Sequence, residues 1–298
     1  MRLPADRHPY GIPEGCLLRH NASMISIPTA FSSSYAQARV KVLEAAATAG
    51  LAITSFAHPL AGKDGEDLAM DVALDGSPDA KELLIVSSAC HGVEGYCGSG
   101  VQVFALHDAE WREKARSAGV AVLYIHALNP HGFSHIRRVT NENVDLNRNF
   151  QDFSKALPPA TANPGYASVH DLLLPKTWPP TPENIALCAD WMAANALKGS
   201  NNPDEASGLR AFQQAVTKGQ YTHADGLFFG GHAPTWSNLT LRKVLRQYAQ
   251  KCTKLAWIDL HTGLGPTGLG ERIFACKDDA AAYERASRWW GNAGNPCG

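Results

Sequence analysis

The chain has 298 residues, of which 45% are hydrophobic and 18% charged, and its formal net charge is −1 at pH 7. That length can bury a sizeable core in one domain, or in one domain with insertions. The balanced charge argues against nucleic acid as a partner, and no apolar run approaches the ~18 residues of a membrane span, so we expect neither nucleic-acid nor membrane binding. The sequence does not indicate an oligomeric state.

Cysteine usage points to a reducing compartment. The seven cysteines are an odd number and include no C-x-x-C pair, which argues against a disulfide framework. Residues 1–23 contain prolines and charges but no apolar stretch of the kind that a secretory signal needs. We therefore expect a cytoplasmic protein, with an irregular extension at residues 1–23 and one domain over residues 24–298.

The first half of the chain alternates between predicted strands and helices. Residues 32–49 have helical spacing, with Ser33 or Ser34 as N-cap and Gly50 after the last turn. A strand, a helix and a second strand follow at lengths typical of a βαβ unit, which predicts a parallel pair. We therefore predict an α/β fold with a mixed, mostly parallel sheet flanked by helices. The predicted elements of this half are strands at 51–56, 68–74, 83–88 and 120–126 and a helix at 101–116.

The second half is predicted to contain an insertion, at about residues 151–235, before the chain returns to the sheet. Residues 151–181 are rich in proline and alanine, and we expect them to form an extended loop. The chain stops in a loop after the last predicted helix, from which we expect that a C-terminal part of the domain is missing. The predicted elements are helices at 182–197, 204–218, 237–251 and 278–290 and strands at 255–260 and 272–276.

Two potential metal ligands follow the predicted buried strand 83–88. His91 and Glu94 are three residues apart and lie among glycines, which indicates a backbone that turns sharply and passes close to another segment. Imidazole and carboxylate together suit zinc, whose catalytic sites have three protein ligands and an open position. The simpler alternative is a solvated loop, because any one of the 12 histidines says little by itself.

His261 is the candidate for the third ligand. It also ends a predicted buried strand, 255–260, and enters a loop rich in glycine and proline. Asp259 lies two residues earlier and can face the same side of the strand. It either orients His261 as a hydrogen-bond acceptor or is a buried, hydrogen-bonded carboxylate. Two strand ends with compatible ligand types predict one metal site.

The most polar segment of the chain, residues 129–150, follows the predicted strand 120–126. Ligands of parallel sheets bind beyond the carboxyl ends of the strands. Arg137, Arg138 and Arg148 share this segment with five asparagines, and a guanidinium offers a two-pronged donor for a carboxylate. An ordinary solvated charged surface is the alternative. Beside a metal, the segment predicts recognition of an anionic substrate end.

Three other signals are weaker. Residues 263–268 match G-x-G-x-x-G, but Pro266 and the strand-like residues 272–276 argue against the helix that a dinucleotide site requires. Cys90 is a candidate thiol nucleophile, yet a cysteine after an apolar strand is more often a small buried residue. No G-x-S-x-G motif is present, so a serine hydrolase of the α/β type is not supported.

Together these motifs resemble the zinc carboxypeptidase superfamily, whose relatives include aspartoacylase and succinylglutamate desuccinylase. Four longer stretches, Cys-His-Gly-Val-Glu-Gly, His-Ala-Leu-Asn-Pro-His-Gly-Phe, Arg-Arg-Val-Thr-Asn-Glu-Asn-Val-Asp-Leu-Asn-Arg-Asn-Phe and Ile-Asp-Leu-His-Thr-Gly-Leu-Gly-Pro, resemble more closely the branch called DUF2817. The likeness runs from about Phe31 to Trp290. It is carried by His91-x-x-Glu94, by Arg138 with the run Asp145-Leu-Asn147-Arg148-Asn149-Phe150, and by His261 at a strand end.

The resemblance implies a zinc-carboxypeptidase-like fold and one Zn²⁺ per chain, with His91, Glu94 and His261 as the ligands. Zinc is a Lewis acid and lowers the pKa of a bound water toward ~7, which agrees with hydrolysis. The other implied site residues are Arg138 at the scissile carbonyl, Arg137 as a less favoured candidate for that place, and Asn147 and Arg148 at the substrate's terminal carboxylate.

Two departures from the family pattern bear on activity. Val93 stands where many carboxypeptidases have an arginine between the first two ligands, which weakens a role in ordinary C-terminal peptide trimming. The family takes its general base from a glutamate well after the third ligand, whereas Glu271 lies in a different loop and Glu284 in a predicted helix. We therefore expect the base to lie beyond Gly298 or to be lost.

These observations predict a zinc-dependent hydrolase of carboxypeptidase type that cleaves an amide bond near a carboxylate of a small peptide. The nearest alternative is an N-acyl amino acid deacylase of the aspartoacylase kind. A zinc- or ligand-binding protein without turnover is the third, and the missing base favours it. The sequence indicates neither the particular substrate nor the pathway.

Overall fold

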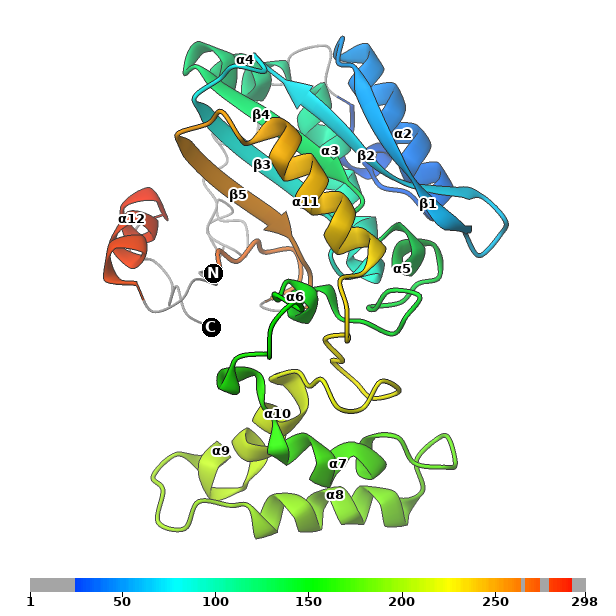
Figure 1. Cartoon of the computed structure of the whole chain (residues 1–298), viewed down its shortest axis with the longest axis vertical. Coiled ribbons are helices and arrows are strands. Elements are labelled where there is room, and N and C mark those ends of the chain that lie inside the picture. Colours follow the sequence, from blue (N-terminus) through cyan, green and yellow to red (C-terminus); the bar gives the residue numbers. More distant parts are fainter. Residues whose placement is uncertain (1–24, 264–265, 274–278, 291–298) are drawn as a thin grey trace, which may run out of the picture. The chain divides into compact units, whose positions relative to one another are not determined.

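The computed structural model describes residues 25–263, 266–273 and 279–290. The chain divides into two compact units, residues 1–261 and residues 262–298. The first contains the sheet and the insertion (Figure 1). In the second, the structure describes the helix α12 (Ala280–Trp290). The extension predicted at residues 1–23 lies outside the described residues. None of the helices in the described ranges has the length and apolar composition to cross a membrane.

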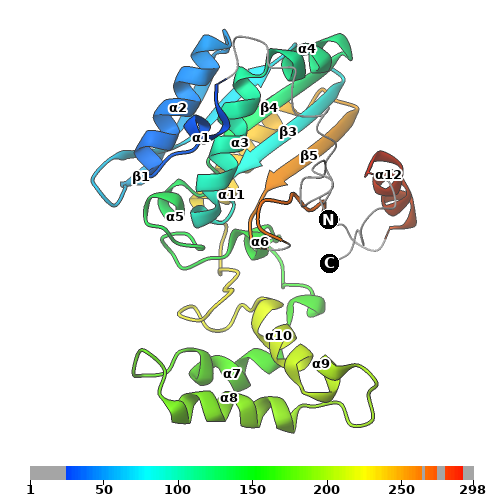
Figure 2. The same cartoon turned by 180° about the vertical axis from the view of Figure 1, so that it is seen from behind.

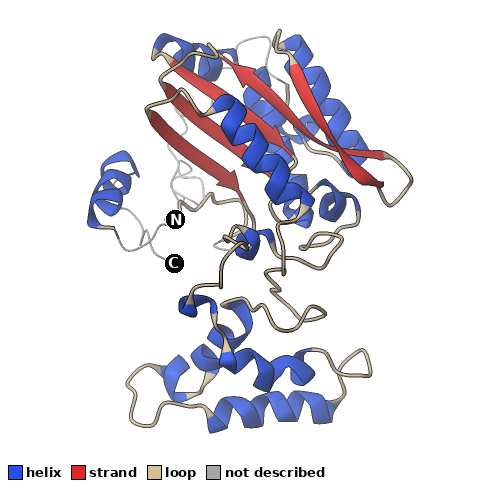
Figure 3. Cartoon of the chain, viewed as in Figure 1, coloured by secondary structure: helices blue, strands red, loops and turns tan. Residues whose placement is uncertain are grey.

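A five-stranded mixed sheet forms the centre of the first unit (Figure 3). Its strand order is β1-β2-β4-β3-β5, and β3 pairs in parallel with both β4 and β5. β2 pairs antiparallel with β1 and β4; β1 and β2 are joined by a short turn, which permits only an antiparallel hairpin. The predicted mixed α/β sheet is confirmed, although parallel pairs do not predominate. The strands are β1 (Ile53–Ala61), β2 (Asp67–Asp75), β3 (Glu82–Ser88), β4 (Val120–His126) and β5 (Lys254–Leu260).

Helices cover both faces of the sheet. The opposite views in Figures 1 and 2 show α2 (Tyr35–Thr48) and α3 (Gly95–His107) on one face and α11 (Trp236–Tyr248) on the other. Successive residues of β3 alternate between the two layers, because Ile85 packs in the core cluster with α11 and Val86 in the cluster with α2 and α3. The shorter helices of this unit outside the insertion are α1 (Ile27–Ala30), η2 (Gly92–Glu94), α5 (Pro130–Ser134) and α6 (Leu146–Asn149).

Polar caps set the ends of two of these helices. The Ser34 hydroxyl accepts a hydrogen bond from the backbone N–H of Gln37 at 3.2 Å, so Ser34 is the N-cap of α2. The predicted helix 101–116 is interrupted at Asp108, which has extended backbone and accepts from the N–H of Trp111 at 3.0 Å. Asp108 therefore ends α3 and starts a separate helix, α4 (Ala109–Ser117).

The insertion is more helical than the sequence predicted. Residues 151–181 were expected to be an extended loop, but Pro164–Leu173 form α7, with Pro164 in the first turn, where the missing N–H costs nothing. Tyr166 and Val169 of α7 form a small separate core with Ala215. The remaining helices here are η3 (Pro159–Thr161), α8 (Pro182–Ala194), α9 (Pro203–Ala206) and α10 (Leu209–Thr217).

The strand before His261 differs from the prediction in its burial. β5 was predicted to be buried, but it lies at one edge of the sheet, and among the described residues it pairs only with β3. Leu255, Trp257 and Ile258 are consequently exposed. Of the strand predicted at 272–276, Arg272 and Ile273 are not in a strand, and residues 274–276 lie outside the described residues.

His126, at the end of β4, predicts a loss of stability in mild acid. The side chain is fully buried, its Nε2 lies 3.1 Å from the Ser99 hydroxyl, and its Nδ1 has no hydrogen-bond partner among the described residues. Burial lowers the pKa of His126 to about 4. The unfolded chain, with a His pKa of ~6.5, therefore binds a proton that the folded chain does not, so stability is full above pH 6.5 and falls as the pH drops toward 4.

We expect His126 to reduce the free energy of unfolding by roughly 2 kcal/mol between pH 7 and pH 5. Urea unfolding of the metal-free chain at several pH values measures this loss, with His126→Asn as the comparison because Asn does not titrate. The variant should lose less stability than the parent over this pH interval. Equal losses in both chains would show that His126 does not carry the effect.

Candidate metal centre

The segment after β3 brings its two candidate ligands, His91 and Glu94, against the polar segment 129–150. Gly92 lies so close to that segment that a Cβ on it would be 2.0 Å from the backbone carbon of Gly132. The N–H of Gly92 donates to the carbonyl of Arg138, and the N–H of Val93 to that of Arg137, at 3.2 and 3.0 Å. The glycine after His91 is thus required by a close backbone approach, as the sequence indicated.

Sheet pairing brings His261 to the same place. β3 and β5 run in parallel, with Ser87 opposite Asp259 and Ser88 opposite Leu260, so their carboxyl ends coincide. His261 follows β5 directly. The structure therefore unites His91, Glu94 and His261, as predicted from two separate strand ends.

The potential ligand atoms of these three residues converge. His91 Nδ1 lies 3.2 Å from one Glu94 carboxylate oxygen, His261 Nδ1 lies 2.8 Å from the other, and the two Nδ1 atoms are 3.3 Å apart. In a tetrahedral zinc site with bonds of ~2.0–2.1 Å, neighbouring ligand atoms lie about 3.3 Å apart. The spacing therefore fits a single zinc ion, and the three residues form one of the two potential metal-binding groups among the described residues.

Two outer carboxylates fix which ring nitrogens point to that centre. Asp145 lies 3.3 Å from His91 Nε2, and Asp259 lies 2.6 Å from His261 Nε2. A carboxylate accepts a hydrogen bond, so each Nε2 carries a proton, and each Nδ1 faces the centre, where it can bind a cation once its own proton is released. Two imidazole nitrogens and a carboxylate thus face one another, an arrangement in which a cation can replace the protons.

The charges of the centre are strongly coupled. Burial by itself would raise the pKa of Glu94, but hydrogen bonds with His261 and His91 lower it to about 2. Burial would lower the pKa of His261, but Asp259 and Glu94 raise it to about 10. Burial likewise opposes the protonated form of His91, yet hydrogen bonds with Asp145 and Glu94 raise its pKa. Metal binding at these imidazoles must therefore release protons.

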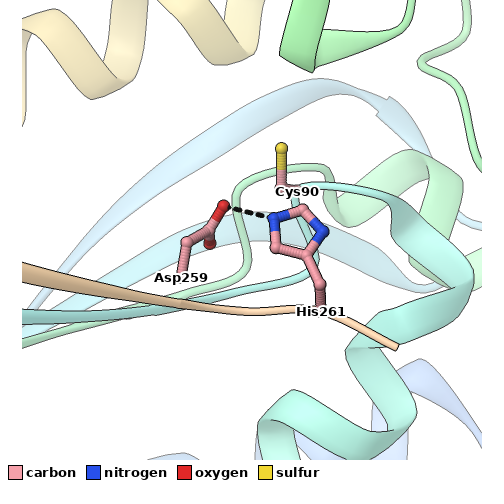
Figure 4. Close-up of side chains that lie close together, drawn as sticks. All are labelled: Cys90, Asp259 and His261. Carbon is pink, nitrogen blue, oxygen red and sulfur yellow. Dashed lines mark hydrogen bonds and ion pairs between the residues drawn. The ribbon is translucent and has the colours of Figure 1, made fainter. Parts of the chain in front are cut away.

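Cys90 belongs to the second potential metal-binding group, with Asp259 and His261 (Figure 4). In that group Asp259 is hydrogen-bonded to His261, and the Cys90 thiol instead donates to the Asn147 side-chain oxygen at 3.1 Å. Burial and three nearby carboxylates raise the pKa of Cys90 well above its usual value. A neutral, buried thiol is a poor nucleophile, so the geometry favours the reading of Cys90 as a small buried residue.

Arg138 is linked to the candidate metal ligand His91 through Asp145. Its Nε and Nη2 donate to one Asp145 oxygen at 3.1 and 3.0 Å, while the other oxygen faces His91. Asp145 is fully buried and also caps α6 through the N–H of Asn147 at 2.9 Å. Although burial opposes it, these partners lower the pKa of Asp145 to about 2. Sequence reasoning assigned no role to Asp145, although it stands two residues before Asn147 in the polar motif.

The predicted substrate-binding residues, Arg137, Asn147 and Arg148, do not converge on the three candidate ligands in the way that Asp145 and Asp259 do. The Arg137 side chain is exposed and makes no hydrogen bond to a described residue. Asn147 is exposed, and its side-chain oxygen accepts from Cys90. The Arg148 guanidinium donates to the carbonyls of Thr217 and Lys218 at the end of α10, at 2.7 and 2.9 Å. Carboxylate binding by Arg148 stays a prediction, and it would compete with these two contacts.

Those contacts predict that Arg148→Ala destabilises the protein even without substrate. Two hydrogen bonds to helix-terminal carbonyls are lost, for which we expect a fall of about 1–2 kcal/mol in the free energy of unfolding. Arg210→Ala is the matched control, because Arg210 on α10 makes only an exposed ion pair with Glu205 and should cost below about 0.5 kcal/mol. Denaturant unfolding compares the two variants, and equal losses would contradict a specific role of Arg148.

The dinucleotide motif at residues 263–268 falls partly outside the described residues. Of the motif the structure describes Gly263 and residues 266–268, and neither these residues nor the following residues 269–273 form a helix. A helix starting in the motif is what a pyrophosphate site requires. The motif therefore receives no support from the described segment.

Comparisons with known proteins identify a family. A family model described as "Protein of unknown function (DUF2817)" matches residues 31–295. No curated protein matches the chain. Similar solved structures include a metallo-carboxypeptidase from Burkholderia cenocepacia, with 12% identity, a TM-score of 0.30 and coverage of 76% of this chain and 60% of that one. A glutaminyl cyclase from Porphyromonas gingivalis has 12% identity, a TM-score of 0.23 and coverages of 74% and 99%.

An esterase from Mycobacterium marinum is also similar, with 14% identity, a TM-score of 0.21 and coverages of 79% and 80%. The chain thus spans about 60% of the length of the carboxypeptidase that it matches. At these TM-scores the structural likenesses carry no argument about activity. The family match covers residues 31–295, which include all four motifs, and it shows family membership only.

Proposed function

The chain belongs to the DUF2817 family, and from the geometry of its site we propose that it is a zinc-dependent hydrolase of carboxypeptidase type. Its substrate would be a small peptide or an N-acyl amino acid, cut at an amide bond near a carboxylate. One observation supports this above all: His91 Nδ1, His261 Nδ1 and the Glu94 carboxylate converge at about the spacing of the ligand atoms in a tetrahedral zinc site.

His91, Glu94 and His261 would hold the zinc. When bound, a zinc ion in such a site supplies Lewis acidity and a water of lowered pKa. The protein holds the two imidazole rings in place, because the Nε2 atom of His91 is bound by Asp145 and the Nε2 atom of His261 by Asp259. These contacts hold the imidazole rings close to the orientation that metal binding requires.

Arg138 would stabilise the negative charge that develops on the scissile carbonyl oxygen. Asp145 holds one edge of the guanidinium, and Nη1 makes no hydrogen bond to a described residue. A fixed cationic donor beside a metal is the kind of group that stabilises an oxyanion. Asn147, Arg148 and Arg137 are the candidates for binding the substrate's carboxylate, because they belong to the same segment.

We also propose that the protein acts in the cytoplasm. Cys90, Cys97, Cys188 and Cys252, the cysteines that the structure describes, are all free thiols. Free cysteines are typical of a reducing compartment. Zinc binding without turnover is the second candidate function, because binding needs only the ligand group of His91, Glu94 and His261.

The test uses the zinc-loaded chain with a panel of dipeptides and N-acyl amino acids, each beside its carboxamide, with products followed by mass spectrometry. We expect turnover of carboxylate substrates that stops on chelation and returns with zinc, and at least tenfold slower turnover of the carboxamides. Failure to bind zinc would refute the proposal. One zinc per chain without turnover of any substrate would favour the binding protein.

A further inference from the structure

Strained backbone marks the segments of the site, and one strained residue lies far away in sequence. Among the described residues, four that are not glycine have φ in the left-handed region: Ala89 (57°), Ile136 (55°), Asn143 (62°) and Phe228 (52°). Ala89, Ile136 and Asn143 each lie two residues before a residue of the site, namely His91, Arg138 and Asp145, respectively. A bulky residue in this region is an outlier, and such strain collects at functional sites. Phe228 therefore requires an explanation.

Phe228 reaches the site from the end of the insertion. Its ring centroid lies 4.9 Å from the Arg138 Cζ atom, with the guanidinium over the ring. Two backbone hydrogen bonds hold Phe228 and Phe229 in place. The N–H of Asp145 donates to the Phe229 carbonyl at 2.8 Å, and the N–H of Gln220 donates to the Phe228 carbonyl at 3.2 Å. The Gly-rich loop 226–232, to which sequence analysis gave no role, thus covers a candidate catalytic residue.

Arg138 is consequently held on two sides. Asp145 binds the edge formed by Nε and Nη2, and Phe228 covers a face. The side chain is still 38% exposed, and its Nη1 has no hydrogen-bond partner among the described residues. We propose that Phe228 is a positioning residue for Arg138, which keeps the guanidinium aimed at the substrate carbonyl. This inference rests on the proposed role of Arg138 in hydrolysis.

The contact of the Phe228 ring with the Arg138 guanidinium gives a physical reason to hold Phe228 in the left-handed region. A cation over an aromatic face is attracted by the ring quadrupole, and the attraction is larger where water is excluded. Leu at this position would keep an apolar side chain but lose that attraction, whereas Tyr would keep the ring. Glycine would relieve the left-handed backbone and remove the contact. The three substitutions therefore separate positioning from stability.

The first experiment observes Arg138 directly, without activity. In a ¹⁵N-labelled protein, the Arg138 Nε–H signal is assigned by its loss in Arg138→Lys. We expect Phe228→Leu to shift this signal, because the ring current is removed, and Phe228→Tyr to leave it close to the parent position. Phe56→Leu is the control, since the Phe56 ring lies 5.2 Å from Lys243 Nζ on another part of the sheet. An Arg138 signal that does not move in Phe228→Leu would overturn the proposal.

The second experiment uses turnover of the best substrate. Phe228→Leu should lower kcat/KM by roughly 3- to 30-fold, mostly through kcat, with unchanged zinc content, and Phe228→Tyr should recover most of the loss. Phe228→Gly should lose activity equally while its melting temperature does not fall. Parent-like kcat in Phe228→Leu would overturn the proposal. If the parent itself has no turnover, the proposed function fails, and the Arg138 signal alone decides whether Phe228 holds the guanidinium.

Discussion

Replacing His91 or Glu94 by Ala is expected to reduce bound zinc from about one ion per chain to below about a tenth, while the chain stays folded. Three protein ligands are the usual number in a catalytic zinc site, and two rarely retain the ion. The fold should persist because the sheet and its two helical layers are assembled independently of the ligand atoms. Elemental analysis after dialysis and the melting temperature of the metal-free chains measure the two effects.

A buried histidine outside the centre provides the control. His131 is nine-tenths buried on α5 and belongs to neither potential metal-binding group. His131→Ala should keep the parent zinc content, although it should lower stability. Zinc retained by both His91→Ala and Glu94→Ala would refute the ligand assignment.

Asp145→Asn has the second largest expected effect, and it should weaken zinc binding and destabilise the fold together. The buried carboxylate lies between the His91 imidazole and the Arg138 guanidinium. The amide is nearly the same size but uncharged and has one acceptor oxygen instead of two, so the His91 proton is held less strongly on Nε2 and Arg138 loses its counter-ion. We expect zinc affinity to fall by about 10- to 100-fold and stability by about 3 kcal/mol.

Asp259→Asn separates these two effects. Asp259 orients His261 in the same way, but it is partly exposed, and Arg138 does not contact it. Zinc affinity, measured by competition with a chromogenic chelator, should fall in both variants. Denaturant unfolding of the metal-free chains should show a large loss only for Asp145→Asn. Parent affinity in Asp145→Asn would mean that this carboxylate does not set the orientation of His91.

Local patterns determined much of the fold. Short apolar runs predicted β3, β4 and β5, and helical spacing with a serine cap predicted α2. The reason is that hydrogen bonding and burial of a strand or helix depend on residues near in sequence. Pro164 was a misleading local signal, since proline in a first turn starts a helix as readily as it breaks one.

The sequence by itself also predicted the candidate ligands, because His91 and Glu94 share one turn and His261 ends a strand. Only the tertiary structure decided that they meet: the parallel register of β3 and β5 aligns strand ends about 170 residues apart in the chain. It alone placed Asp145 between His91 and Arg138, Arg148 on the end of α10, and Phe228 over the guanidinium. These contacts depend on the order of the strands in the sheet and on the position at which the chain leaves the insertion and re-enters the sheet domain. Neither can be predicted from the local periodicity of the sequence.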